Sequence, residues 1–494
     1  MEYETVIGLE VHAQLLTNSK MFCACSADYQ HAPPNTVVCE ICMAQPGVLP
    51  VVNRRAVELV IATGLSVGCT IAEDTKFDRK NYPYPDLMKG YQISQYDMPI
   101  ASNGTLRIRT ENGDKVVRIN RVHLEEDVAR LLHRSKNGQP YSLLDVNRAG
   151  VPLMETVSEP DMRTPDEARA YLISLRSILR YIGASRANME EGSFRCDANV
   201  SVRKKGETRL GRKVEVKNMN SFRSVFNALE YEQNRQIKLV EEGRAIVQET
   251  RGWNEGKQIT ESQRSKEGES DYRYFPDPDL PPLKIGASLV DEIRCQLPEL
   301  PEARNNRFVT DYGLSIYDAR LLTSSKFFAD YFELVVESNK FLGKDLKRRA
   351  KSAGNWMLGE MTRLLKETDQ NIETVKIRPE YLSELIDLVD GGTLSTTMAR
   401  NVFELMFETG NAPKDIAERD GLVQLGDVDS LQPVVTQAVL ENPNTVADYL
   451  GGKDTALRYL VGQIMKTTRG KANPSVVTEL LTEELERIKQ DDGY

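Results

Sequence analysis

The sequence predicts an α+β protein: an N-terminal domain of mixed strands and helices, followed by domains that are entirely helical. Before residue 293, segments that alternate apolar and polar residues lie between amphipathic helical segments. After residue 293, apolar residues recur at helical spacing only, and histidine and cysteine disappear after Cys295. We therefore expect three domains, at residues 1–293, 294–409 and 410–494.

Length and composition are typical of a globular protein. The chain has 494 residues, of which 40% are hydrophobic and 28% are charged, so it can bury a large core. Its net charge of −9 excludes a protein that is basic overall, but not a local basic surface. No apolar run approaches the ~20 residues that a membrane helix needs, and the N-terminus lacks the basic region of a signal peptide. A cytoplasmic protein is the default expectation.

The first predicted strand is Val6 to Gln14, where apolar residues alternate with polar ones. A period of two places Glu10 and His12 on one face of this strand. A carboxylate and an imidazole in this arrangement can converge on a cation. The alternative is a polar strand face that only contacts water.

Four cysteines follow in two pairs, Cys23/Cys25 and Cys39/Cys42. Two pairs separated by a loop are the usual way to present four thiolates tetrahedrally to Zn²⁺. In a cytosolic protein, zinc is favoured over disulfides. We expect a structural zinc knuckle at 23–42; the alternative is four reduced thiols without metal.

A short helix is predicted at Arg54–Ser66, and an irregular loop between Asp78 and Tyr96. This loop contains prolines, four tyrosines and the cations Arg79, Lys80 and Lys89. Aromatic faces and cations suit nucleotides, although such a loop can also be a packed surface segment.

Two further segments place acids near apolar residues. Leu106 to Leu132 is hairpin-like, with a turn at Asn112-Gly113, and its second arm carries His123, Glu125 and Asp127 on one side. Ser142 to Val157 contains Glu155 in an otherwise apolar stretch, where a carboxylate requires a partner.

The rest of the first domain is predicted to be structural scaffold, with polar residues along one face of its strands. Thr164 caps a helix that Gly183 ends, a second helix spans 221–242, and strands are predicted at 189–203 and 213–220. These strands carry Asp197, Glu215 and Lys217. The proline-rich segment from Gln263 to Ile285 can be neither helix nor central strand, and we expect a charged flap.

The tail contains a basic patch on an acidic protein. Between Gly451 and Pro474 a single acid, Asp454, accompanies five cations: Lys453, Arg458, Lys466, Arg469 and Lys471. Such a patch suits nucleic acid; the alternative is a solvated helix face.

An acid-rich site with one imidazole suits Mg²⁺ or Mn²⁺ better than zinc, because hard cations prefer oxygen. Basic and aromatic loops around it suggest a phosphorylated or nucleotide substrate. The residues by themselves thus predict a metal-dependent enzyme that acts on a nucleotide-like substrate.

Several motifs resemble the B subunit of the tRNA-dependent amidotransferases, the GatB family. They extend over nearly the whole chain: VIGLEVHAQL, YPYPDLMKGYQISQYD, RVHLEED, LLDVNRAGVPLMETVSEPD, EEGSFRCDANVSVR, EVKNMNSFRSV, DYRYFPDPDLPP and the C-terminal GQIMKTTRGKANP. The resemblance implies a catalytic "cradle" domain with kinase and transamidase activity, a helical domain and a YqeY-like tRNA-binding tail.

The resemblance also implies the reaction. The B subunit uses ATP and Mg²⁺ to phosphorylate the side-chain carboxylate of Glu on tRNA(Gln) or Asp on tRNA(Asn). Ammonia from the A subunit, a glutaminase, then displaces the phosphate, and the C subunit completes a heterotrimer. The chain shows no amidase-like Ser-Ser-Lys pattern, so we expect it to import its ammonia.

Carried over to this sequence, the family's Mg²⁺ ligands are His12, Glu125 and Glu155, with Glu10 beside them. Candidates for a catalytic role or for binding ATP or the aminoacyl end are Lys89, Arg148, Asp197, Glu215 and Lys217, and the zinc ligands are Cys23, Cys25, Cys39 and Cys42. Two alternatives remain: the archaeal E subunit, specific for Glu-tRNA(Gln), and a non-catalytic tRNA-binding scaffold. The E subunit carries an insertion for which the segment from Ile285 to Pro301 leaves no room.

Overall fold

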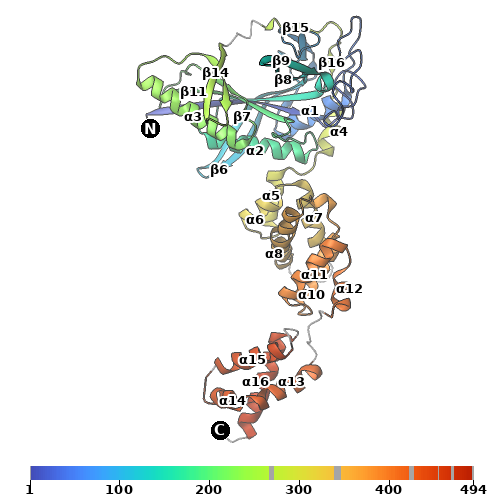
Figure 1. Cartoon of the computed structure of the whole chain (residues 1–494), viewed down its shortest axis with the longest axis vertical. Coiled ribbons are helices and arrows are strands. Elements are labelled where there is room, and N and C mark those ends of the chain that lie inside the picture. The colour runs from blue at the N-terminus through green and yellow to red at the C-terminus, as the bar shows by residue number, and fades with distance from the viewer. Residues whose placement is uncertain are drawn as a thin grey trace. The chain divides into compact units, whose positions relative to one another are not determined.

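The computed structural model describes residues 2–265, 272–338, 346–421, 428–453, 455–468 and 472–491. The chain forms two compact units, Met1–Pro301 and Glu302–Tyr494. The first contains the strands and the second contains only helices in its described residues, as the α+β prediction requires (Figure 1).

A nine-stranded sheet forms the centre of the first unit, in the order β14-β13-β12-β11-β1-β10-β7-β6-β2. Neighbouring strands are antiparallel except the parallel pair β12 and β13. The strands are β1 (Tyr3–Gln14), β2 (Thr70–Ile71), β6 (Ala101–Thr110), β7 (Gly113–Glu126), β10 (Pro152–Ser158), β11 (Phe194–Lys204), β12 (Val214–Lys217), β13 (Glu249–Asn254) and β14 (Ile259–Ser265).

Three helices cover one face of this sheet: α1 (Arg54–Ser66), α2 (Pro165–Tyr181) and α3 (Phe222–Glu241) (Figure 1). Thr164 caps α2 by accepting a hydrogen bond from the Glu167 backbone NH, as predicted. The apolar residues of β1, including Ile7 and Leu9, belong to the core cluster beneath these helices. The alternation along β1 therefore places Glu10 and His12 on the opposite face.

Smaller elements complete this unit. The loop expected between Asp78 and Tyr96 contains two paired strands, so the prediction of a wholly irregular loop was wrong. Its prolines lie in the connection between these strands, where they do not interrupt pairing. The elements are β3 (Asp74–Thr75), β4 (Asp78–Asn81), β5 (Tyr91–Ser94), β8 (Arg130–Lys136), β9 (Gln139–Asp145), β15 (Phe275–Pro276), β16 (Leu283–Lys284) and α4 (Ala287–Gln296).

The helical unit contains two separate hydrophobic clusters. The first is built by α5 (Pro301–Thr310), α6 (Ile316–Leu322), α7 (Lys326–Glu337), α8 (Leu346–Trp356), α9 (Thr362–Glu367), α10 (Pro379–Asp390), α11 (Thr396–Thr409) and α12 (Pro413–Arg419). The second is built by α13 (Val428–Glu441), α14 (Pro443–Leu450), α15 (Thr455–Thr467) and α16 (Pro474–Asp491).

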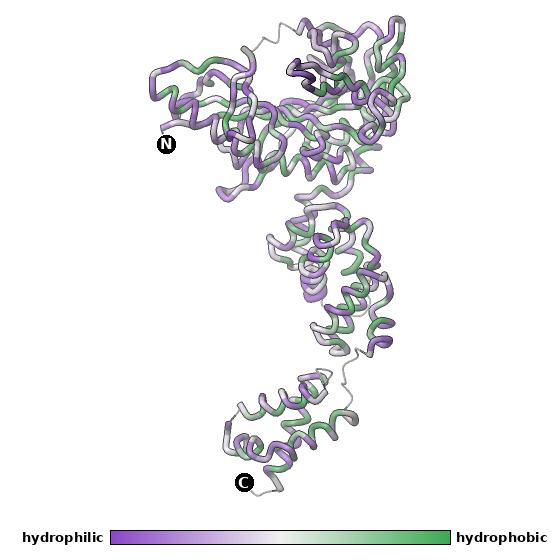
Figure 2. Tube along the Cα trace, viewed as in Figure 1, coloured by the Kyte–Doolittle hydropathy of each residue, from purple (hydrophilic) through white to green (hydrophobic). Residues whose placement is uncertain are grey.

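Hydrophilic and hydrophobic residues alternate at short intervals along these helices (Figure 2). Each helix therefore has one apolar face for its own cluster. Among the described residues, no helix has the length and apolar character to cross a membrane.

Candidate active site

Strands β1, β10 and β7 lie next to each other and carry three of the predicted metal ligands. His12 on β1 pairs with Glu155 on β10, and Glu155 in turn pairs with His123 on β7. The His12 Nε2 atom lies 3.4 Å from both Glu125 Oε1 and Glu155 Oε2. The structure thus brings together His12, Glu125 and Glu155, whose ligand atoms all lie within 4.8 Å of one another.

The electrostatics of this cluster favour a positive charge at its centre. Burial by itself would lower the pKa of His12, but the facing carboxylates of Glu155 and Glu125 raise it to about 9. The pKa of Glu155 is well below its usual range, because His123 and His12 outweigh the effect of burial. A site that binds a proton this strongly offers the charge and the oxygen donors that a hard divalent cation prefers.

A second acidic cluster lies on the other side of β1. Glu10 pairs with Asp197 on β11, and Glu215 on β12 joins them, again with ligand atoms within 4.8 Å. Burial raises the pKa of Glu10, and the charges of Glu155 and Asp197 raise it further. The Lys217 ammonium forms an ion pair with Asp197 and lies 3.5 Å from Glu215 Oε1.

Lys80 faces the first cluster from β4, surrounded by aromatic rings. Its Nζ atom lies 5.0 Å from the ring centre of Tyr272 and 5.9 Å from that of Tyr82. Within the described residues the ammonium makes no hydrogen bond or ion pair. Burial opposes its charge, but Glu125 and Glu155 raise the pKa of Lys80 above its ordinary value.

These groups line one cavity of about 650 Å³. Both acidic clusters, the Lys80 ammonium and the rings of Tyr82, Tyr272 and Tyr274 open into it. A cavity of this size can hold a nucleotide-sized ligand. Its acids can bind divalent cations, and its lysines can bind phosphate or carboxylate oxygens.

Two predicted site residues do not line this cavity. Lys89 forms an ion pair with Glu126, and Arg148 donates hydrogen bonds to the backbone carbonyls of Val128 and Ala129. Both side chains are thus held by the segment 126–129, and Arg148 Nε lies 3.6 Å from Asp127 Oδ1, a carboxylate that lines the cavity.

The sequence-based site list missed several lining residues. Lys80, Tyr82, His123 and Arg195 line the cavity but were not chosen as site residues, and neither were Lys213, Tyr272 and Tyr274. The motif around Asp78–Tyr96 indicated an aromatic and basic site, but nothing in the sequence distinguished Lys80 from Lys89 as the lysine of that site. Arg195 could have been found from its position two residues before Asp197, since this spacing places both side chains on the same face of strand β11.

The four paired cysteines converge in the loop that follows β1. Cys23, Cys25, Cys39 and Cys42 present sulfur atoms within 4.8 Å of one another. The Cys39 backbone NH donates a hydrogen bond to Cys42 Sγ at 3.1 Å. A hydrogen bond from Cys23 lowers the pKa of the Cys42 thiol, aided by the Cys39 NH and by Lys20. This geometry fits a tetrahedral thiolate site.

Three of the five predicted nucleic-acid-binding cations are described. Lys453 precedes α15 and forms an ion pair with Asp448, whereas Arg458 and Lys466 lie exposed on α15. Arg469 and Lys471 lie outside the described residues.

Comparison with known families defines the class of protein first. Residues 5–291 match the GatB/GatE catalytic domain, and residues 330–485 match the GatB domain. The first match contains the whole cavity and both acidic clusters.

Full-length relatives then specify the family. The chain is 54% identical to the B subunit of the aspartyl/glutamyl-tRNA(Asn/Gln) amidotransferase of Dehalococcoides mccartyi strain CBDB1, over 98% of this chain and 99% of that protein. It is 52% identical to the corresponding protein of Caldanaerobacter subterraneus and 51% identical to that of Thermomicrobium roseum, over 99% of this chain in both comparisons. The chain belongs to the family of aspartyl/glutamyl-tRNA(Asn/Gln) amidotransferase B subunits. It is one component of an enzyme, a carbon–nitrogen ligase that uses glutamine as amide donor.

Proposed function

We propose that this protein activates the side-chain carboxylate of Glu on tRNA(Gln), of Asp on tRNA(Asn), or of both, by ATP-dependent phosphorylation. The observation that carries the proposal is the convergence of His12, Glu125 and Glu155 opposite Lys80, whose ammonium has no ion pair within the described part of the chain. This arrangement supplies a cation-binding site and an ammonium group in a single cavity. Phosphoryl transfer depends mainly on such positioning and charge neutralisation.

The residues present fit Mg²⁺. His12, Glu125 and Glu155 would hold it, and the shift of the His12 pKa to about 9 reflects the attraction of this position for positive charge. When bound, the ion would neutralise phosphate oxygens. The second cluster, Glu10 with Asp197 and Glu215, supplies another set of oxygen donors, at present arranged around Lys217.

The other side chains orient the reactants. Lys80 would bind the transferred phosphoryl group, with its ammonium held near the rings of Tyr82 and Tyr272. A carboxylate oxygen of the substrate attacks the γ-phosphorus, and the bond from that phosphorus to ADP breaks. Ammonia then attacks the acyl carbon and inorganic phosphate leaves, which gives the amide.

Partners follow from the family. We propose that ammonia comes from a glutaminase, the A subunit of the complex, and that this chain forms a heterotrimer with it and with a C subunit, as the name of the relatives' B subunit suggests. We further propose that the cysteine knuckle binds a structural Zn²⁺.

The test is tRNA-stimulated ATP hydrolysis by the assembled enzyme. Glu125→Ala and Glu155→Ala should each lower its rate by about 10²-fold or more, because each removes charge stabilisation at the transferred group. The glutaminase chemistry of the partner should remain. The control is Glu111→Ala, at an exposed turn between β6 and β7. Near-normal rates of ATP hydrolysis in both variants would refute the assignment of these two glutamates. If tRNA does not stimulate ATP hydrolysis by the wild type, the protein is a non-catalytic tRNA-binding scaffold instead.

A further inference from the structure

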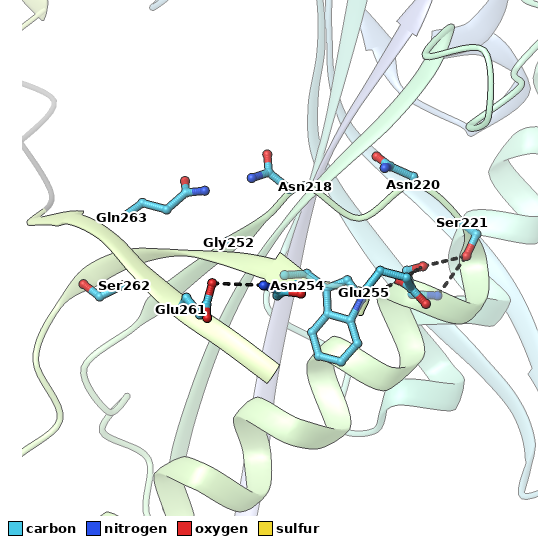
Figure 3. A pocket seen from close by; sticks show the side chains of 11 residues that line it. Asn218, Asn220, Ser221, Gly252, Asn254, Glu255, Glu261, Ser262 and Gln263 are labelled. Atoms are coloured by element: carbon cyan, nitrogen blue, oxygen red, sulfur yellow. Dashed lines mark hydrogen bonds between the residues drawn. The ribbon is translucent and has the colours of Figure 1, made fainter. Parts of the chain in front are cut away.

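A second pocket lies beyond the active site, where β12 leads into α3 and meets β13 and β14. Its volume is about 710 Å³. Most side chains that line it are uncharged and polar, and Figure 3 shows the amides of Asn218, Asn220 and Gln263 extending into its open space. We call this pocket the amide groove; it is lined by Asn218, Asn220, Ser221, Ser224, Gly252, Trp253, Asn254, Glu255, Glu261, Ser262 and Gln263.

Three of the four amide side chains that line this groove are available to a ligand; the fourth, Asn254, donates a hydrogen bond to Glu261. Among the described residues, the side chains of Asn218, Asn220 and Gln263 have no hydrogen-bond partner. Two of them meet above Gly252: a methyl group there would lie 2.2 Å from Gln263 Nε2 and 3.1 Å from Asn218 Nδ2. A side chain at this position would therefore require the flexible Gln263 amide to move and the Asn218 amide to shift slightly.

The carboxylates of the groove, by contrast, already have partners. Glu255 accepts hydrogen bonds from Ser224 at 2.7 Å and from the Trp253 indole at 2.6 Å. Glu261 accepts from Asn254 at 3.1 Å and from Lys257 at 2.8 Å. The groups left for recognition are therefore neutral amides, each with both donors and an acceptor. They suit a neutral heterocycle better than a phosphate or a cation.

The groove adjoins the active site through the backbone. Asn218 directly follows Lys217, which lines the active-site cavity, and Lys217 pairs with Gly252 across β12 and β13. A positive φ of 66° at Asn218 turns the chain out of the strand at this point. The groove and the cavity thus share the end of strand β12, at Lys217 and Asn218.

We propose that the amide groove binds an adenine nucleoside. Asparagine and glutamine amides recognise adenine by donating to N7 and accepting from the N6 amino group. Resting on the proposed function, two substrates could supply this ring: ATP, and the terminal adenosine of the aminoacyl-tRNA.

The kinetic test uses the assembled enzyme with Asn218→Gly/Asn220→Ala/Gln263→Ala. Glycine is compatible with the positive φ at 218. The KM for ATP or for the aminoacyl-tRNA should rise about tenfold, as for the loss of a bidentate base contact, with kcat little changed. Gly252→Ala should act in the same direction but by a smaller factor, because the added methyl group moves the Gln263 amide without removing it. Asn137→Gly is the matched control, since Asn137 is an exposed turn residue with a φ of 53°.

The outcomes distinguish the two substrates. A rise in the KM for ATP alone assigns the groove to the adenine of ATP. A rise in the KM for the aminoacyl-tRNA alone assigns it to the terminal adenosine of the tRNA. Unchanged KM values for both substrates in the triple variant and in Gly252→Ala overturn the proposal.

A binding test keeps this proposal separate from the proposed function. In saturation-transfer NMR with the full-length protein, adenosine should contact the wild type more strongly than inosine, which lacks the N6 amino group, and the triple variant should lose this difference. Equal contact by both nucleosides, or none, overturns the groove assignment even if ATP hydrolysis depends on tRNA.

Discussion

Lys80 is a charged side chain of the active site that opens into the cavity. Within the described residues it has aromatic neighbours but no anionic contact, while Glu125 and Glu155 keep it protonated. We expect Lys80→Met to lower kcat for tRNA-stimulated ATP hydrolysis by about 10²-fold, as for loss of one charge-stabilising contact. Lys80→Arg should recover part of it, because the charge is retained.

Steady-state kinetics of both variants would check this prediction. Lys136→Met is the matched control, since Lys136 is an exposed lysine on β8 that does not line the cavity. If Lys80→Met raises only the KM and leaves kcat unchanged, Lys80 binds the ground state and does not stabilise the transferring group.

Sequence periodicity predicted the parts of the site that lie on single strands. Alternation along 6–14 placed Glu10 and His12 on one face, and the structure places them there. It could not choose between Lys80 and Lys89. That choice depends on Tyr272, which comes from a distant segment to surround Lys80, and on Glu126, which forms an ion pair with Lys89.

At the scale of single elements, local signals were sufficient where a segment has its own cap or period. The helix predicted at Arg54–Ser66 has these bounds in the structure. The strands β4 and β5 were missed because their stability comes from pairing with each other and with β15, which is distant in sequence. Strand propensity read from the local sequence does not reflect pairing with a segment that is distant in the chain.

The cysteine knuckle is an element whose order should depend on metal. Purified protein should contain about one Zn²⁺ per chain, bound by four thiolates. Cys39→Ser should lower the zinc content and increase hydrogen exchange between residues 20 and 45, while exchange in the central sheet stays unchanged. Metal analysis with hydrogen-exchange mass spectrometry would check this.

Cys295→Ser is the control for the knuckle, because Cys295 is exposed and far from the knuckle in sequence. Protein with well under one zinc per chain, whose exchange does not respond to Cys39→Ser, would show that the knuckle is stable without metal.

At the scale of the whole molecule, we propose that the C-terminal helices bind the tRNA body. Arg458 and Lys466 lie about two helical turns apart on α15 and are exposed. A basic helical surface can recognise double-stranded RNA by its shape. Removing the chain after Gly421 should weaken tRNA binding and reduce its salt dependence, because each phosphate contact contributes to that slope. ATP binding should remain.

The extent of the two hydrophobic clusters in the helical unit determines where the chain should be truncated. Helix α12, with buried Ile416 and Ala417, belongs to the first helical cluster, so a cut near residue 410, the predicted domain boundary, would damage that cluster. Filter binding over a salt series would measure the effect, with Arg458→Ala/Lys466→Ala as a folded variant. Unchanged affinity and slope after truncation would assign these helices to packing or to a protein partner.

The central position of β1 has a consequence for how the enzyme loses activity. Glu10 and His12 lie on the middle strand of nine, and each acidic cluster is completed by the two strands that follow on one side of it. Fraying at the sheet edges leaves both clusters intact, whereas separating them requires the breakage of the sheet itself. Heat or denaturant should therefore not separate activity from the folding of the central sheet: chemistry and the sheet of the first unit should be lost in one cooperative transition, whatever the state of the helical unit.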